Sequence, residues 1–182
     1  MNIEFRNIDE NFRDLKAVED IYLEAFPELY DIPYSIYLEF VKNGDGYILA
    51  AYDEEKLIGY IAYLICREGV FVENFAVSKD LRDKGYGSQI LSKFIDRFRE
   101  QYPNINFFLE VEEPSYDAPN LEQRKKRIAF YERLGFVMTD IKDDFLGIIY
   151  ITMTTMNPID KETLNKLKVQ VDKIYNKYKQ LQ

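Results

Sequence analysis

The sequence predicts an α/β (α+β) fold, with one domain built on a central sheet that is flanked by helices. At 182 residues, of which 47% are hydrophobic, the chain has enough apolar material for one core and too little for two ordinary domains. Segments rich in β-branched and aromatic residues alternate with segments whose apolar residues recur every three or four positions, as strands and amphipathic helices do. No internal repeat or flexible linker separates these segments, so we expect them to share one core.

The first half of the chain predicts four strands and two helices. We expect a strand at 3–6, a helix over 12–26, a short helix over 33–42, and strands at 47–52, 57–66 and 70–77. Asp9 and Asn11 are favourable N-cap residues for the first helix, and Pro27 ends it. Short polar turns join the last three strands, so an antiparallel meander is their simplest arrangement.

The second half continues the alternation and ends in an appended helix. We expect a helix over 88–102, a strand at 105–111, a helix over 121–134 that stops at Gly135, and strands near 136–139 and 145–155. Residues 156–182 are Lys-rich with apolar residues at helical spacing, which predicts an amphipathic helix appended to the domain of residues 1–155. This helix either packs on its own domain or forms a dimer contact, so monomer and homodimer both stay open.

Composition narrows the function classes. The chain has no histidine, which excludes a Ser-His-Asp hydrolase and a His-ligated metal site, and we expect no metal. The formal net charge of −8 argues against attachment to nucleic acid or to an anionic membrane, and it favours a cationic partner. The N-terminus has no signal-peptide pattern and no apolar run is long enough to cross a bilayer, so we expect a cytoplasmic protein.

The segment from Phe71 to Ser88 joins a predicted strand to a predicted helix and suits a phosphate ligand. Gly85 and Gly87 allow close approach of the backbone, and the start of the helix presents unpaired N–H groups. The spacing is not that of a P-loop, and the third glycine of a dinucleotide fingerprint is missing because residue 90 is isoleucine. An ordinary strand-to-helix turn is the plain alternative.

Two motifs resemble those of the GNAT superfamily of N-acetyltransferases. The run from Arg82 to Gly87, preceded by Phe75-Ala76-Val77, resembles the Q/R-x-x-G-x-G/A acyl-CoA motif, and Phe130–Phe136 resembles the second signature, F-Y-x-x-x-G-F. The resemblance covers residues 1 to about 155. It implies a mixed, mostly antiparallel sheet of about seven strands flanked by four helices. It also implies transfer of an acetyl group from the co-substrate acetyl-CoA to a primary amine, by direct attack in a ternary complex.

The resemblance also assigns residues. The coenzyme pyrophosphate would be held by the backbone of Arg82, Asp83, Lys84, Gly85, Tyr86, Gly87 and Ser88, and the pantetheine arm would pair with Phe75, Ala76 and Val77. Tyr131 would be the general acid beside the leaving thiolate, with a buried core tyrosine as the alternative. Glu73 is the candidate general base, and Glu110 and Glu112 are its rivals. The family often has asparagine seven positions before the motif tyrosine, where this chain has Arg124.

The acceptor is expected to be a small-molecule or peptide amine, and an acidic, aromatic lining favours a cationic one. Its candidate contacts are Glu28, Tyr30, Asp31, Tyr34, Glu73, Glu112, Glu113, Tyr116 and Asp117. The sequence names neither the amine nor the length of the acyl chain. A non-catalytic acyl-CoA-binding or sensor module is the alternative from another functional class.

Overall fold

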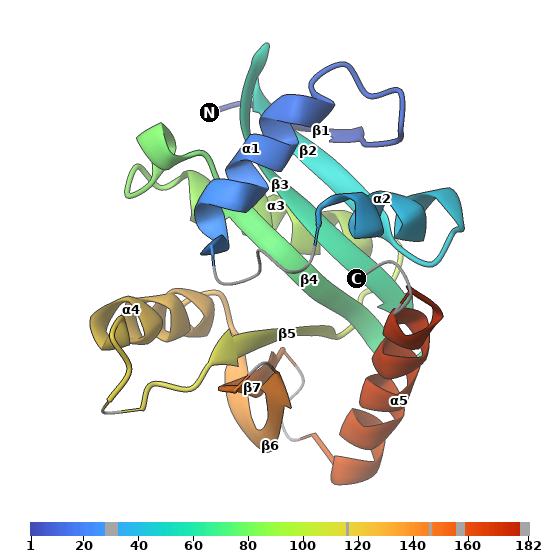
Figure 1. Ribbon diagram of the computed structural model, residues 1–182, viewed down its shortest axis with the longest axis vertical. Coiled ribbons are helices and arrows are strands. Elements are labelled where there is room, and N and C mark those ends of the chain that lie inside the picture. The colour runs from blue at the N-terminus through green and yellow to red at the C-terminus, as the bar shows by residue number, and fades with distance from the viewer. Residues whose placement is uncertain (28–32, 116, 146, 156–158, 179–182) are drawn as a thin grey trace.

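The structure is a computed structural model that describes residues 1–27, 33–115, 117–145, 147–155 and 159–178 (Figure 1). Within these ranges one seven-stranded sheet has the order β1-β2-β3-β4-β5-β7-β6. Its strands are β1 (Ile3–Asn7), β2 (Tyr47–Asp53), β3 (Lys56–Cys66), β4 (Gly69–Val77), β5 (Phe107–Glu112), β6 (Val137–Phe145) and β7 (Ile148–Thr154). The pair β4–β5 is parallel and the other neighbours are antiparallel, so the predicted mixed, mostly antiparallel sheet is confirmed.

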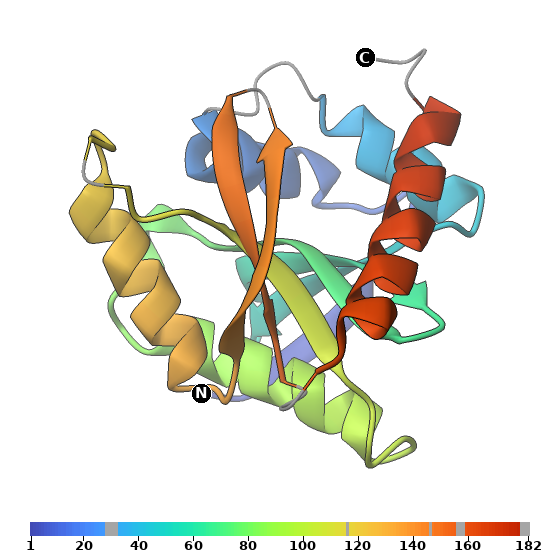
Figure 2. The same ribbon diagram turned by 90° about the horizontal axis from the view of Figure 1, so that it is seen from below.

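Helices cover both faces of the sheet (Figures 1 and 2). They are α1 (Leu15–Ala25), α2 (Ser35–Lys42), α3 (Tyr86–Arg99), α4 (Leu121–Glu132) and α5 (Lys161–Tyr178). Tyr22 of α1, Phe40 of α2 and Leu167 of α5 share one buried apolar cluster. Phe94 of α3 and Ile128 of α4 belong to a second cluster on the opposite face. The sheet therefore separates two cores, as the alternating inward residues of its central strands require.

The C-terminal helix α5 packs on its own chain. Its residues Leu164, Leu167 and Val171 are buried in the same cluster as α1 and α2. This is the first of the two arrangements that the amphipathic pattern allowed. The division of the chain into a domain of residues 1–155 and an appended segment of residues 156–182 stays a prediction.

The sheet opens between β4 and β5. These two strands pair only over Val70–Val72 and Phe107–Leu109, and β5 then pairs with β7 on its other side. In the remainder of β4, Asn74–Val77 pair with β3 on one side only, and Glu73 is the extra residue at a β-bulge. Figure 1 shows the two strands diverging from this point toward α4. A strand edge is thus left with backbone groups that a ligand can reach.

Several boundaries differ from the sequence prediction, and those of the first helix and the last hairpin have a local cause. The first helix begins at Leu15 instead of residue 12, because the Asp9 carboxylate accepts a hydrogen bond from the Asn11 N–H at 2.8 Å and holds a turn. The last hairpin runs to Phe145 in β6 and restarts at Ile148 in β7, so the predicted strands at 136–139 and 145–155 were wrong in extent. A bulge between Met138 and Lys142 breaks the alternation that marks a strand.

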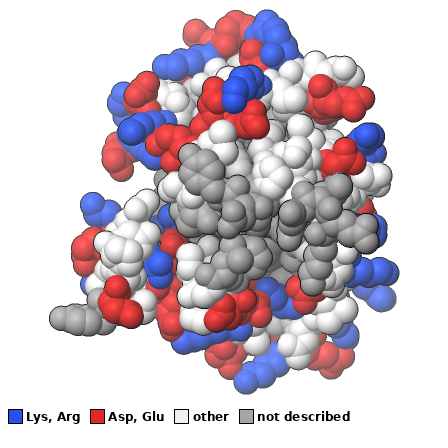
Figure 3. All heavy atoms as spheres, in the orientation of Figure 1, with Lys and Arg blue, Asp and Glu red and all other residues white. Residues whose placement is uncertain are grey.

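On the face drawn in Figure 3, acidic and basic side chains are interspersed, and neither sign of charge forms a separate patch. None of the helices within the described ranges is long and apolar enough for a membrane span.

Candidate active site

The loop between β4 and α3 presents a cluster of free backbone N–H groups. Asp83 (φ 59°) and Gly85 (φ 84°) both have left-handed backbone conformations, and Gly85 is the N-cap residue of α3. The first helical hydrogen bond joins the Gln89 N–H to the Gly85 carbonyl at 3.3 Å. The N–H groups of residues 86–88 therefore have no acceptor within the helix. Such a turn at the positive end of a helix suits a phosphate group.

The cationic side chains of this loop hold the loop itself. The guanidinium of Arg82 forms a two-point ion pair with Glu24, at 2.8 and 3.2 Å, and its Nε donates to the Val77 carbonyl at 3.1 Å. Lys84 donates to the backbone carbonyl of Asp80 at 2.7 Å. Because these charges already have partners, the backbone amides are the main anion-binding groups that the loop offers.

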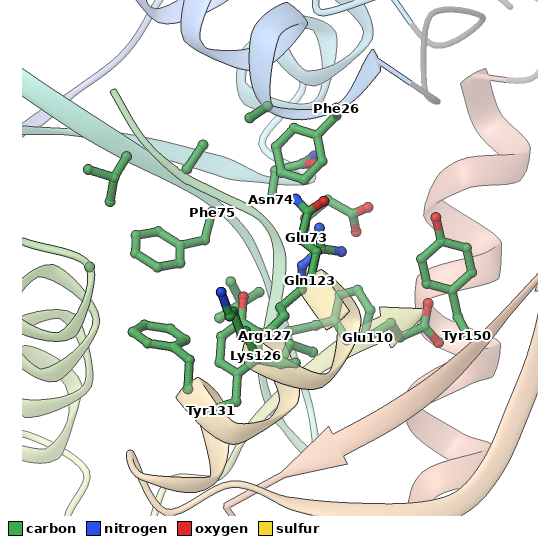
Figure 4. Close-up of a pocket in the computed structure, with 18 of the residues that line it drawn as sticks. Phe26, Glu73, Asn74, Phe75, Glu110, Gln123, Lys126, Arg127, Tyr131 and Tyr150 are labelled. Atoms are coloured by element: carbon green, nitrogen blue, oxygen red, sulfur yellow. The ribbon is translucent and has the colours of Figure 1, made fainter. Parts of the chain in front are cut away.

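A cavity of about 1240 Å³ runs from this loop along β4 to α5. Eight of the predicted coenzyme-binding residues line it: Phe75, Ala76, Val77, Arg82, Asp83, Gly85, Gly87 and Ser88. Lys84 and Tyr86 do not line it, and the Tyr86 hydroxyl donates instead to Asp53 at 2.9 Å. Figure 4 shows Phe75 and Tyr131 on one side of the cavity, with Glu110 and Tyr150 on the other side toward α5.

The cavity walls fit a long ligand with a phosphate-bearing end. The unpaired edge of β4, Glu73–Val77, leads away from the amide cluster. The rings of Phe75 and Phe130 are nearly parallel, with centroids 6.3 Å apart. A Cβ atom added at Gly87 would lie 3.5 Å from the Phe130 ring, so a side chain there would occupy the passage between loop and ring. Amide donors, a strand edge and apolar walls therefore form one continuous channel.

Tyr131 lies on α4 and lines this channel, and the residue is 9% exposed. Phe130 and Phe136 pack against it, with centroid distances of 5.1 and 5.8 Å. Burial raises the pKa of Tyr131 to about 12, against a smaller lowering by Arg127. Its hydroxyl has no hydrogen-bond partner among the described residues. At neutral pH the phenol therefore keeps its proton and can donate it into the cavity.

Glu73 also lines the cavity, from the unpaired part of β4. Its Oε1 accepts a hydrogen bond from the Tyr175 hydroxyl, and its Oε2 is buried with no partner among the described residues. Burial raises the pKa of Glu73 to about 7, and the nearby charge of Glu110 adds to this, while Tyr175 and Lys168 oppose it. A carboxylate with this pKa can take up and release a proton near neutral pH.

The two rival carboxylates have cationic partners. Glu110 lines the cavity, but Lys168 lies 2.5 Å from its Oε1; burial raises the pKa of Glu110 and Lys168 lowers it. Glu112 is only 3% exposed and lies outside the cavity lining. Arg124 and Arg127 pair with its two oxygens at 3.1 and 2.5 Å. Of the three candidates, Glu73 lines the cavity without a direct cationic partner in the described part of the chain.

Arg124 connects α4 to the end of β5 instead of facing the cavity. It donates to Asn120 at 2.7 Å and to the Glu113 carbonyl at 2.8 Å, in addition to its ion pair with Glu112. The basic residues 124–127 therefore do not act as one group: Lys126 and Arg127 line the cavity, and Arg124 does not.

The predicted acceptor residues are only partly brought together. Glu28, Tyr30, Asp31 and Tyr116 lie outside the described residues. Tyr34 is buried in the α1–α2 core, and Glu112, Glu113 and Asp117 do not line the cavity. The structure adds residues that sequence reasoning missed, which are Asp143, Asp144, Tyr150, Lys168, Asp172, Tyr175 and Asn176. One sequence signal could have pointed to two of them. Lys168 and Tyr175 are seven positions apart, so they lie on one face of the predicted helix, beside its apolar stripe.

Comparison with known proteins identifies the family. Residues 15–136 match the model of the acetyltransferase (GNAT) family. A putative GNAT-family acetyltransferase from Bacteroides thetaiotaomicron is 27% identical, with 93% of this chain and 94% of that chain covered and a TM-score of 0.70. A spermidine N-acetyltransferase chimera from Vibrio cholerae and hSSAT is 16% identical (90% and 98% covered, TM-score 0.65). An aminoglycoside 6'-N-acetyltransferase complexed with coenzyme A is 18% identical (86% and 99% covered, TM-score 0.61).

The search of curated proteins gave no significant match. The family match spans more than half of the chain, and the protein therefore belongs to the acetyltransferase (GNAT) family.

Proposed function

We propose that this protein is an N-acetyltransferase that moves an acetyl group from acetyl-CoA to a primary amine while both are bound in the cavity. The observation that carries the proposal is that the loop with the amide cluster, Tyr131 and Glu73 all line one cavity. Acetyl-CoA supplies the activated acetyl thioester when it is bound. The backbone of residues 82–88 would hold its pyrophosphate, and the free edge of β4 at residues 75–77 would align its pantetheine arm.

Glu73 and Tyr131 have complementary protonation states for this chemistry. An amine arrives mainly as an ammonium ion, and Glu73, with a pKa of about 7, would accept a proton so that the neutral nitrogen can attack. A nitrogen–carbon bond forms and the carbon–sulfur bond breaks. Tyr131, with a pKa of about 12, would give its proton to the departing sulfur. The second proton, which the nitrogen loses as the amide forms, would restore the Tyr131 hydroxyl. A backbone N–H at or beside Phe75 would polarise the thioester carbonyl during the attack.

The part of the cavity nearest α5 favours a cationic amine. Its acidic members are Glu73, Glu110, Asp143, Asp144 and Asp172. The α5 residues in this lining include one basic residue, Lys168. Its charge is already paired with Glu110 and Asp143. Tyr150 and Tyr175 add aromatic faces that attract cations. Polyamines, aminoglycoside-like compounds and lysine side chains are the classes that fit, and structurally similar proteins include acetyltransferases named for spermidine and for an aminoglycoside.

A turnover screen with acetyl-CoA and a panel of cationic, neutral and anionic amines tests the proposal. We expect the cationic amines to react fastest. Glu73→Gln should lower kcat by about 100-fold or more, since general base catalysis typically contributes that much. The matched variant Glu110→Gln, on the neighbouring strand, should retain most of kcat and raise KM for the amine, because Glu110 is one of the acidic residues of the lining. Reaction of anionic amines alone would contradict the cationic acceptor, and coenzyme A binding without turnover of any amine would favour a non-catalytic binding module.

A further inference from the structure

The C-terminal helix α5 lies outside the part of the chain that matches the GNAT family, residues 15–136. It nevertheless forms one wall of the cavity. Figure 2 shows α5 across the β6–β7 hairpin from α4, the helix that carries Tyr131. The α5 residues in the lining are Lys168, Val171, Asp172, Tyr175 and Asn176. This helix is therefore placed to act on the proposed reaction, although the family motifs do not include it.

Tyr175 is the α5 residue that contacts the proposed base directly. Its hydroxyl donates a hydrogen bond to Oε1 of Glu73, between residues 102 positions apart in the sequence. Its ring packs edge-on against Phe40 of α2, with centroids 5.4 Å apart and an interplanar angle of 90°. The ring is thus held by the core while the hydroxyl reaches into the cavity. One carboxylate oxygen of Glu73 is held in this way, and the other, Oε2, is buried without a hydrogen-bond partner among the described residues.

We propose that Tyr175 is a positioning residue for Glu73, which fixes the orientation of the carboxylate and the pH at which it accepts a proton. This rests on the proposed function, in which Glu73 is the base. A hydroxyl that donates to a carboxylate stabilises its charged form, so loss of that hydroxyl leaves Glu73 protonated up to a higher pH. The same loss frees the carboxylate to rotate away from the orientation that the Tyr175 hydrogen bond fixes.

Several other groups surround Glu73 and stay in place when the Tyr175 hydroxyl is removed. They are Lys168 from α5, Glu110 from β5, Tyr37 from α2, and Tyr60 and Cys66 from β3. Lys168 lowers the pKa of Glu73 through its charge and Glu110 raises it. Lys168 is itself paired with Glu110 and Asp143, and these pairs do not involve Tyr175. The change at Tyr175 therefore removes its hydrogen bonds to Glu73 and Tyr37 and leaves the ion pairs of Lys168 intact.

The chain contains a matched control on the same helix. Tyr178 also donates its hydroxyl to a carboxylate, Asp45, at 2.6 Å, and its ring also packs on Phe40, at 4.7 Å. Neither Tyr178 nor Asp45 lines the cavity. Tyr175→Phe and Tyr178→Phe thus each remove one tyrosine–carboxylate hydrogen bond from the same core, and only the first lies at the proposed base.

The experiment measures the pH profile of kcat/KM for the wild type, Tyr175→Phe and Tyr178→Phe, with the best amine from the screen and saturating acetyl-CoA. In Tyr175→Phe we expect the acidic limb of the profile to move to higher pH by about one unit. At pH values on the acidic side of the limb this is about a tenfold loss of kcat/KM. KM for acetyl-CoA should not change. Tyr178→Phe should overlay the wild type. A ¹³C NMR titration of the Glu73 carboxyl should show the same upward shift without requiring turnover.

The outcomes separate this inference from the proposed function. If Tyr175→Phe overlays the wild type in both the rate profile and the NMR titration, while Glu73→Gln is inactive, Tyr175 has no positioning role and Glu73 remains the base. An equal shift in Tyr178→Phe would show a general effect of loosening α5 and would also overturn the inference. Full activity of Glu73→Gln would instead remove the base assignment in the proposed function, whatever the Tyr175 variant does.

Discussion

Replacing Glu73 with glutamine should stabilise the folded protein at alkaline pH while it removes the proposed proton acceptor. Folding raises the pKa of this carboxyl from its usual 4.5 to about 7, chiefly through burial. The folded state therefore holds a proton that the unfolded chain has already lost, and Glu73 costs stability increasingly as pH rises from about 4.5 to about 7. Glutamine keeps an oxygen that can accept the Tyr175 hydrogen bond and carries no charge at any pH.

The size of the effect follows from the shift. At 1.36 kcal/mol per pKa unit, the full cost of ionising the buried Glu73 is about 3 kcal/mol above pH 8. This is a ceiling, because the side chain is half-buried and the cavity admits water. We therefore expect Glu73→Gln to exceed the wild type in free energy of unfolding by about 2 to 3 kcal/mol at pH 8.5, and by under about 1 kcal/mol at pH 5.

Urea denaturation at a series of pH values, without ligand, measures this difference. Asp45→Asn is a control with the opposite sign. The pKa of Asp45 is lowered, first by Lys177 and then by Tyr178, so its contribution to stability is present above its unfolded pKa and lost as pH falls. Asp45→Asn should therefore destabilise the protein at neutral pH, and the difference should shrink in acid. A Glu73→Gln variant whose stability parallels the wild type from pH 5 to 8.5 would refute the raised pKa and the burial argument together.

Three further predictions concern the other parts of the site. Tyr131→Phe should lower kcat by about 100-fold in steady-state assays, with calorimetric affinity for coenzyme A unchanged; equal rates would remove the general-acid role. Gly85→Ala should cost about 1 kcal/mol in urea denaturation and weaken coenzyme A binding, because φ is 84° there; tighter binding would contradict the amide-cluster assignment. Arg124→Met should lower the free energy of unfolding by about 3 kcal/mol by leaving Glu112 with one cationic partner, and a loss under about 1 kcal/mol would show that the pair is not structural.

The sequence could predict the fold class and the motif loop because both depend on local signals. Strands and helices follow from periodicity, and the left-handed conformation at Gly85 follows from the glycine itself. The same argument failed at β6, where the bulge between Met138 and Lys142 interrupts the alternation. Periodicity reports regular backbone only, so an irregular strand with several charged residues resembles a loop.

The position of α5 could not be predicted for a different reason. An amphipathic stripe says that Leu164, Leu167 and Val171 face something apolar, but it does not say which surface. The contact between Tyr175 and Glu73 depends on long-range packing of α5 beside α2, with Phe40 between them. No local pattern contains that information, and the family motifs end before α5 begins.

The choice among the three glutamates shows how tertiary contacts settle what spacing leaves open. Glu110 and Glu112 are two positions apart on β5, so both lie on one face of the strand, and spacing alone cannot distinguish them. In the folded chain Glu110 pairs with Lys168 of α5 and Glu112 with two arginines of α4. Glu73 instead receives a neutral hydroxyl, which restrains its orientation without placing a cation against it. A buried carboxylate with such a partner has a pKa near the working pH, and this is the property that a general base needs.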